Sequence, residues 1–304
     1  MTSAASRSGT SRVRCVADGF TFLEAPRWHD GRLYVSDFFS HRVLSFDAAG
    51  RMHPVCEVSG QPSGLGFMPD GSLLVVSMLD RRLLRLYAGR LCEFANLAPF
   101  SAFPCNDMIV HPSGRAYIGN FGWDIANDQR IRSTRLLLVE ANGSVNALEH
   151  ELVFPNGMVI LPGEVLLVSE TFAARVSQFD IEPSGALSLR SVWASFSSQR
   201  FSTTTEAVAA GVPLPDGLCL DAEGAVWMGD AAGRGALRVA PGGRILERVD
   251  TSPLTVFAAT LGGMDGRTLY MCAGPSMSSK EGAADNSSAL LACRVAVPAA
   301  TMSS

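Results

Sequence analysis

The chain has 304 residues, of which 47% are hydrophobic and 18% are charged, and its formal net charge is −4. This composition supports a large buried core and excludes a disordered chain. The weak negative charge, with no basic run outside the first residues, argues against nucleic acid as a partner. Uncharged apolar runs such as 207–215 and 289–293 are shorter than the roughly 20 residues of a membrane-spanning helix, so we expect no membrane insertion.

The N-terminal segment and the cysteines give no sign of a reactive site. Residues 1–12 are rich in Ser, Ala and Arg and lack the apolar segment of a secretory signal, so we predict a disordered tail on a cytoplasmic protein. The seven cysteines are scattered singly without a C-x-x-C pair, which is typical neither of a zinc site nor of a disulfide framework. Residues 13–304 are predicted to form one domain.

Short apolar runs bounded by Gly, Pro, Asp and Ser recur along the chain, and helical periodicity is almost absent. This pattern is typical of an all-β protein. Six of the runs align on a turn glycine, and each reads as a strand, a turn and a second strand. In chain order they are 24–37, 62–77, 106–120, 155–170, 215–230 and 257–272.

The spacing of the turn glycines predicts the architecture. Successive glycines lie 40, 43, 49, 61 and 42 residues apart. A period of roughly 40 to 50 residues with about four short strands is that of a propeller blade. We therefore predict a six-bladed β-propeller with four antiparallel strands per blade, in which a more polar outer pair of strands follows each hairpin. The last strand, 289–297, has no hairpin after it, and we expect it to pair with N-terminal strands and close the ring.

In a propeller, the residues just before the inner strands converge on one end of the central channel. At this register the sequence has Glu24, Ser63, Asn106, Asn156, Asp216 and Phe257. Any single Asn or Asp here is explained by the preference of turns for these residues. Four carboxylate or carboxamide side chains at one register instead favour a shared site for a hard cation, with Ca²⁺ ahead of Mg²⁺.

Several motifs taken together resemble those of one family. They are Glu24-Ala-Pro-Arg-Trp, Asn106-Asp-Met, Pro155-Asn156-Gly, Pro215-Asp216-Gly-Leu-Cys-Leu-Asp-Ala-Glu-Gly and Leu269-Tyr-Met-Cys-Ala. Over residues 22–297 the chain resembles the gluconolactonase, senescence marker protein and luciferin-regenerating enzyme superfamily of six-bladed propellers, which includes a phosphotriesterase-like branch. The resemblance implies a divalent cation held by Glu24, Asn156 and Asp216, with Asn106 as a ligand or a substrate contact. Ca²⁺ is the ion we expect, and Mg²⁺, Mn²⁺ or Zn²⁺ are alternatives.

The resemblance also implies the hydrolysis of lactones. A bound cation polarises an ester carbonyl, stabilises the oxyanion that develops there and lowers the pKa of a coordinated water. Asp216 is the expected catalytic group, as general base or as nucleophile. Because a carboxylate bound to a dication is a weakened base, we favour attack by a coordinated water that Asp216 deprotonates. Asp37, Asp107, Glu170 and Asp230 are expected to have structural roles.

One departure from the family bears on the substrate. Sugar lactonases of the family typically have the motif Arg-x-Asn-Asp before the third blade, and its arginine holds substrate hydroxyls. This chain has Pro104-Cys105-Asn106-Asp107 at the same place and so lacks the arginine. Seven apolar side chains are expected around the same rim, in the pocket or in the core: Phe38, Phe39, Met78, Phe121, Trp123, Phe172 and Phe257. We therefore expect a substrate less polar than an aldonolactone.

The expected substrate contacts are Asn106, Phe38, Phe121, Trp123 and Phe172. The long segments 123–134 and 195–213 are expected to form a lid over the same face, since loops of this length are usually functional or disordered.

Two other kinds of function stay open at this point. Phosphotriester or epoxide hydrolysis would use the same metal and differ in pocket shape. A calcium-stabilised propeller that binds a partner without turnover is the non-enzymatic alternative, because a fold does not prove a function. An enzyme needs Asp216 for chemistry, whereas a scaffold would tolerate Asn there. The expected partner is a small-molecule substrate, and the expected state is a monomer or a weak homo-oligomer.

Overall fold

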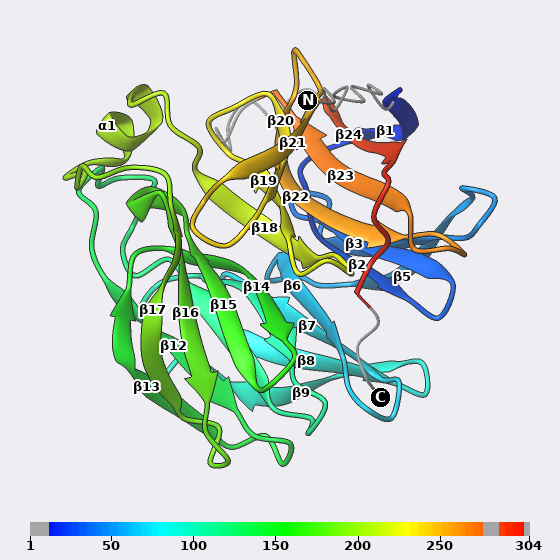
Figure 1. Cartoon of the computed structure of the whole chain (residues 1–304). Helices are drawn as coiled ribbons and strands as arrows, with labels where there is room; N and C mark the ends of the chain where they lie inside the picture. The colour runs from blue at the N-terminus through cyan, green and yellow to red at the C-terminus, as the bar shows by residue number, and fades with distance from the viewer. Residues whose placement is uncertain (1–11, 276–285, 301–304) are drawn as a thin grey trace.

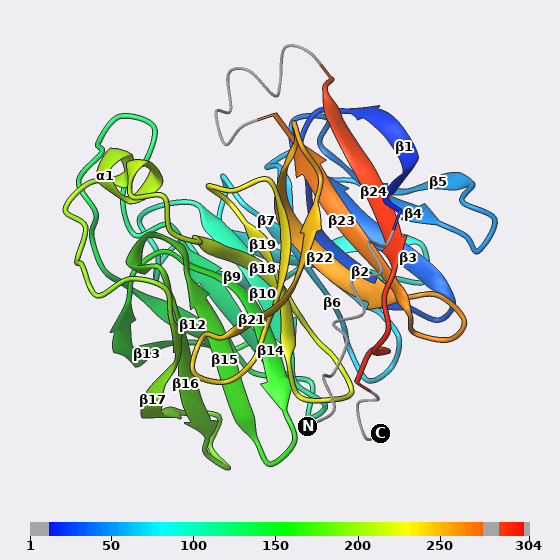
Figure 2. The same ribbon diagram turned by 45° about the horizontal axis from the view of Figure 1, so that its top comes forward.

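The computed structural model describes residues 12–275 and 286–300. These residues form six sheets, each of four antiparallel strands, arranged as the blades of a propeller (Figures 1 and 2). The fold predicted from the glycine spacing is thereby confirmed. The tail predicted over residues 1–12 lies outside the described residues, apart from Arg12.

Five blades are each built from four consecutive strands, ordered from the channel outward. The first two blades comprise β2 (Leu23–His29), β3 (Arg32–Asp37), β4 (Arg42–Phe46) and β5 (Met52–Glu57), then β6 (Pro62–Phe67), β7 (Leu73–Ser77), β8 (Arg82–Tyr87) and β9 (Arg90–Asn96). The third comprises β10 (Cys105–Val110), β11 (Ala116–Asn120), β12 (Thr134–Val139) and β13 (Val145–Leu152).

The fourth and fifth blades follow the same order. The fourth comprises β14 (Pro155–Leu161), β15 (Val165–Glu170), a 3₁₀ turn η1 (Thr171–Ala173), β16 (Arg175–Ile181) and β17 (Leu187–Ser195). The fifth comprises β18 (Pro215–Leu220), β19 (Val226–Asp230), β20 (Gly235–Val239) and β21 (Ile245–Asp250). The helix α1 (Thr204–Ala209) lies between these blades in sequence and projects at one end of the propeller (Figure 1).

The sixth blade joins the two ends of the chain. Its strands, from the channel outward, are β22 (Thr255–Gly262), β23 (Thr268–Gly274), β24 (Ser288–Arg294) and β1 (Arg14–Phe20). Figure 1 shows the red strand β24 beside the blue strand β1, and the Ser288 hydroxyl donates to the Thr21 carbonyl at 3.1 Å. The closure expected from the unpaired last strand is confirmed.

The core lies between neighbouring blades. Leu74 and Val76 of the second blade, for example, pack with Ile118 and Leu137 of the third in one buried cluster. This arrangement corrects the expectation of a polar outer strand pair. Third strands such as β4 and β20 are largely buried, although β8 is partly exposed toward its end. The alternating exposure of a solvent-facing strand is clearest in the fourth strand, as in β5.

None of the helices in the described part of the chain is long and apolar enough to cross a membrane.

Candidate functional site

The inner strands share a local distortion that places the candidate site. Each has a register shift near its start, and in the fourth blade Asn156 and Gly157 together face the single residue Ser169. Such a β-bulge adds a residue to one strand and redirects its side chains. The six residues that the repeat alignment selected all lie at or beside these bulges.

Close contact between inner strands fixes the bulges in place. A Cβ atom on Gly157 would lie 2.4 Å from the backbone nitrogen of Leu218 and 2.5 Å from the carbonyl oxygen of Asp216, so only glycine fits there. The Ser169 hydroxyl also donates to the Asp216 carbonyl at 2.8 Å. The second strand and the bulge of one blade therefore position the site residue of the next.

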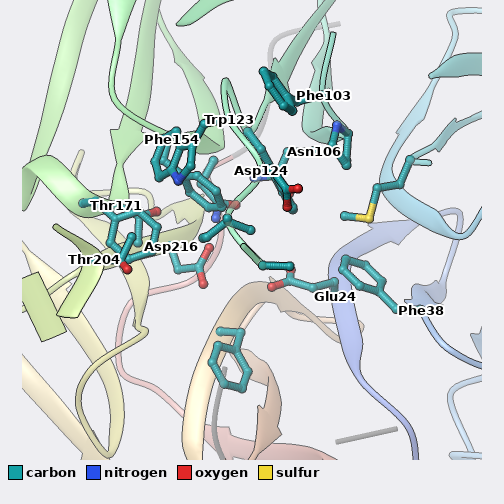
Figure 3. Close-up of a pocket in the computed structure, with 18 of the residues that line it drawn as sticks. Glu24, Phe38, Phe103, Asn106, Trp123, Asp124, Phe154, Thr171, Thr204 and Asp216 are labelled. Atoms are coloured by element: carbon teal, nitrogen blue, oxygen red, sulfur yellow. The ribbon is translucent and has the colours of Figure 1, made fainter. Parts of the chain in front are cut away.

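Four of the selected side chains meet at the floor of one cavity of about 1060 Å³. They are Glu24, Asn106, Asn156 and Asp216, and each is less than 9% exposed. Figure 3 shows the Glu24 and Asp216 carboxylates directed into the same space. Phe257 also lines the cavity, whereas Ser63 does not; Gln61, two residues before it, does.

The two carboxylates at the floor strongly perturb each other. Burial raises the pKa of Glu24 to about 8, although the Ala25 amide donates to its carboxylate and lowers it in part. Burial and the nearby negative charges of Glu24 and Asp107 raise the pKa of Asp216 well above its usual range, while a hydrogen bond from Asn156 opposes the shift. Bringing these acids together without a cation is therefore costly when both are ionised.

Asp107 has a basic partner, unlike the two floor carboxylates. The Arg27 guanidinium lies 2.6 Å from the Asp107 carboxylate and also donates to the Met108 carbonyl at 2.7 Å. In the described part of the chain, no ion pair joins Glu24 or Asp216 to an Arg, Lys or His side chain. The Oδ1 atom of Asp216 has no hydrogen-bond partner there either.

The donor set fits a hard divalent cation. Two carboxylates and two carboxamides are oxygen ligands, and the Asn106 side-chain nitrogen already donates to the Pro155 carbonyl at 3.3 Å, which leaves its oxygen available. Among the described residues, no three His, Cys, Asp or Glu side chains cluster in a way that would hold a metal ion. A cation here would thus depend on the amide oxygens of Asn106 and Asn156 as much as on the acids.

The other acids singled out in the sequence have the structural roles expected of them. Asp37 accepts hydrogen bonds from the backbone of Thr21 and pairs with Arg42. Glu170 pairs with Arg175. The Asp230 carboxylate accepts hydrogen bonds from the backbone amides of two neighbouring loop residues.

The cavity walls are largely aromatic. All seven apolar residues expected at the rim line the cavity, and their role in binding substrate stays a prediction. In one group the Phe121 and Phe154 rings lie 4.8 Å apart and Trp123 lies 5.5 Å from Phe154. Figure 3 shows Trp123 and Phe154 on one side of the floor and Phe38 on the other.

Several lining residues were not found from the sequence. Three of them stand two residues before a position of the repeat register: Phe22, Gln61 and Phe154. Pro104, noted in the sequence for the missing arginine, stands at the same offset and also lines the cavity. Reading the alignment at this second offset would have pointed to them. Thr171, a buried residue whose hydroxyl has no partner in the described structure, and Asp124 come from segments that the repeat does not align.

The two long segments expected to form a lid contact each other beside the cavity. The Thr204 amide donates to the Gln129 carbonyl at 2.9 Å, and the Thr204 hydroxyl donates to the Gln129 side chain at 2.9 Å. Helix α1 begins after Thr203, which forms a reciprocal capping box with Glu206. Both segments contribute to the cavity wall, among other residues through Trp123 and Val208.

A six-bladed propeller with buried carboxylates and carboxamides at one end of its channel, below an aromatic pocket, defines the class to which this protein belongs. Within that class the chain is a member of the SMP-30/gluconolactonase/LRE-like family, whose characteristic region matches residues 22–274.

Individual relatives agree with this assignment. The chain is 30% identical to the pentonolactonase XacC of Haloferax volcanii over 253 residues, which is 82% of this chain and 80% of the relative. It is 25% identical to a 6-deoxy-6-sulfogluconolactonase of Pseudomonas putida over 295 residues, covering 94% and 96% of the two chains. The crystal structure of a calcium-binding protein, regucalcin, from Agrobacterium tumefaciens has the same fold, with a TM-score of 0.74, 18% identity and 96% of each chain covered.

Proposed function

We propose that this protein is a metal-dependent hydrolase of a lactone or a related ester that is less polar than an aldonolactone. The observation that carries the proposal is the pair of buried acids, Glu24 and Asp216, facing one cavity without a basic partner in the described structure. The names of the two sequence relatives, both lactonases, support the reaction class.

A divalent cation would balance the charge of these two acids. Glu24, Asn156 and Asp216 would hold it, with Asn106 as a further ligand or a substrate contact. When bound, such a cation polarises an ester carbonyl and stabilises the negative charge that develops on its oxygen. Ca²⁺ is the proposed ion because irregular sets of carboxylate and amide oxygens suit it.

The residues of the chain supply the remaining parts of the reaction. Water adds to the lactone carbonyl, the ring C–O bond breaks, and the product is a hydroxy acid. Asp216 would accept the proton of the attacking water, because its Oδ1 atom has no other partner. Asn106, held by the Pro155 carbonyl, would orient the substrate at the floor of the cavity.

The walls support a substrate of low polarity. Sugar hydroxyls need hydrogen-bonding side chains, whereas Phe38, Phe103, Phe121 and Trp123 line this cavity and Pro104 stands where sugar lactonases of the family have an arginine. Apolar surface of this kind rewards burial of hydrocarbon at about 25 cal/mol per Å². The cytoplasmic location and the monomeric or weakly oligomeric state stay predictions.

The proposal is tested with a lactone panel. Purified protein is treated with chelator and reloaded with Ca²⁺, Mg²⁺, Mn²⁺ or Zn²⁺, and kcat/KM is measured for gluconolactone, δ-valerolactone and dihydrocoumarin. We expect activity only after reloading, and at least about tenfold higher kcat/KM for the two lactones without ring hydroxyls. Full activity in chelator would refute metal dependence, and a clear preference for gluconolactone would refute the apolar pocket.

A further inference from the structure

The charge pattern of the cavity says more about the ligand than its apolar character does. Among the residues that the structure describes, the lining contains three carboxylates, those of Glu24, Asp124 and Asp216, and no Lys, Arg or His side chain. The nearby Arg27 is engaged by Asp107 and Met108 and does not line the cavity. The cavity is therefore an aromatic space with negative charge and no fixed positive charge of its own.

Asp124 differs from the two floor acids because it lies outside the proposed cation site. It comes from the segment between β11 and β12, and its side chain is exposed on the cavity wall (Figure 3). Its carboxylate accepts one hydrogen bond, from the Asn127 side chain at 2.9 Å, and has no ion-pair partner among the described residues. A cation bound by Glu24 and Asp216 would leave this third charge unbalanced.

A second acid in the same segment shows the contrast. Asp128 pairs with Arg130 at 3.0 Å and with Arg132 at 3.2 Å, so its charge is balanced within the loop. Asp124 and Asp128 are only a few residues apart in sequence. The arginines of this segment pair with Asp128, which does not line the cavity. Asp124 lines the cavity and has no such ion pair among the described residues.

The aromatic walls suit a positively charged group as well. The faces of Trp, Phe and Tyr rings attract ammonium groups, and the attraction is worth about 0.5 to 2 kcal/mol depending on how far the site is desolvated. Trp123, next to Asp124 in sequence, is only 1% exposed and packs against Phe154 and Phe172. The partly exposed rings of Phe103 and Phe121 line the same cavity and are open to a ligand. Phe38 lies on the other side of the floor. An apolar body with a cationic group would thus find both aromatic faces and a free carboxylate.

We propose that the site takes an apolar lactone or ester that carries a basic nitrogen, and that Asp124 selects the protonated nitrogen at the cavity wall. This inference rests on the proposed function for the lactone or ester, but the selection of a cation stands on the cavity alone. Hydrolysis of such a substrate gives a zwitterionic product, which carries a new carboxylate and keeps the basic nitrogen.

The test compares two probes of the same shape that differ in charge. Binding of 1-adamantylammonium and of 1-adamantanol to the Ca²⁺-loaded protein is measured by calorimetry at neutral pH. We expect the ammonium to bind about tenfold more tightly than the alcohol, and we expect this preference to shrink as salt is raised. In Asp124→Asn the preference should fall to about threefold or less, with the affinity for adamantanol unchanged.

Glu149→Gln is the matched control, since it removes one negative charge from an exposed position on β13, which lies away from the cavity lining. It should keep the wild-type preference. Equal binding of the two probes, or a preference that survives Asp124→Asn, would overturn the proposal.

Hydrolysis of dihydrocoumarin, measured in parallel, separates this inference from the proposed function. If the protein hydrolyses the neutral lactone but does not prefer the ammonium, the proposed function stands and the selection of a cation is refuted. If the protein prefers the ammonium but hydrolyses no lactone, the selection of a cation stands and the proposed function is refuted.

Discussion

Arg27 on the inner strand of the first blade reaches Asp107 on the inner strand of the third, with 2.6 Å between the guanidinium nitrogen and the carboxylate oxygen. The inner strand of the second blade, β6, lies between these two strands and has glycines at positions 64 and 66. A Cβ atom on Gly64 would lie 2.6 Å from the backbone nitrogen of Met108. Gly64 thus allows the inner strands of the second and third blades to approach closely, and Arg27 separately neutralises the acid beside Asn106.

Removal of one partner of this ion pair should be costly. Arg27→Met leaves Asp107 buried without its cation, and breaking a buried pair in this way costs about 3 to 5 kcal/mol. The double variant Arg27→Met, Asp107→Asn should recover part of that loss, because no buried charge is left over. Urea unfolding of the wild type, both single variants and the double variant measures the coupling, and additive losses would show that the pair contributes little.

Gly157 should be needed for the site and not only for the fold. In Gly157→Ala the new methyl group meets the backbone of Leu218 and Asp216, so we expect a loss of about 1 to 3 kcal/mol in stability together with weaker cation binding. Gly163→Ala is the control, since Gly163 has φ +86° and open space, and should cost about 1 kcal/mol through strain alone. Calorimetric titration of Ca²⁺ into both variants measures this difference. Equal Ca²⁺ affinity in Gly157→Ala and Gly163→Ala would contradict the prediction.

Asp216→Asn separates an enzyme from a binding scaffold. The variant keeps one carbonyl oxygen for a hard cation but cannot accept a proton, and general-base assistance is typically worth about 10² to 10⁴ in rate. We expect weaker but measurable cation binding and a loss of turnover of at least that order. Asn106→Ala should weaken substrate binding by only about 1 to 3 kcal/mol, which is the cost of losing a neutral hydrogen-bond contact.

Bound metal and turnover of the best lactone are measured for the wild type and for both variants. An Asp216→Asn protein with metal and near-wild-type activity would eliminate Asp216 as the catalytic group.

The stability of the metal-free protein should fall as the pH rises through the slightly acidic and neutral range. Burial raises the pKa of Glu24 from 4.5 to about 8 and that of Asp216 in the same direction, so the folded state binds more protons than the unfolded state in this window. Stability then decreases with pH until these groups have ionised in the folded protein. Saturating Ca²⁺ should supply the missing charge and flatten the curve.

Thermal melts from pH 5 to pH 9, in chelator and in Ca²⁺, measure this effect. Asp216→Asn should reduce the slope in chelator, since it removes one acid of the pair. A melting temperature in chelator that rises over the same pH range would contradict the prediction.

The sequence by itself determined the fold and the floor of the site. Strand, glycine turn and strand recur at blade spacing, and the residue before each inner strand is a local property of the repeat, so Glu24, Asn106, Asn156 and Asp216 were found together. Closure by the last strand followed as well, because a four-stranded sixth blade needs a partner from the other end of the chain.

Only the tertiary structure decided which residues share the cavity and which charges are balanced. Ser63 has the same register as the site residues but does not line the cavity, whereas Gln61, two residues earlier, does. Asp124 and Asp128 look alike in sequence, yet Asp128 meets two arginines and Asp124 faces the cavity. Repeats specify local geometry, whereas the balance of charge depends on loops and long side chains that meet across blades, as Arg27 and Asp107 do.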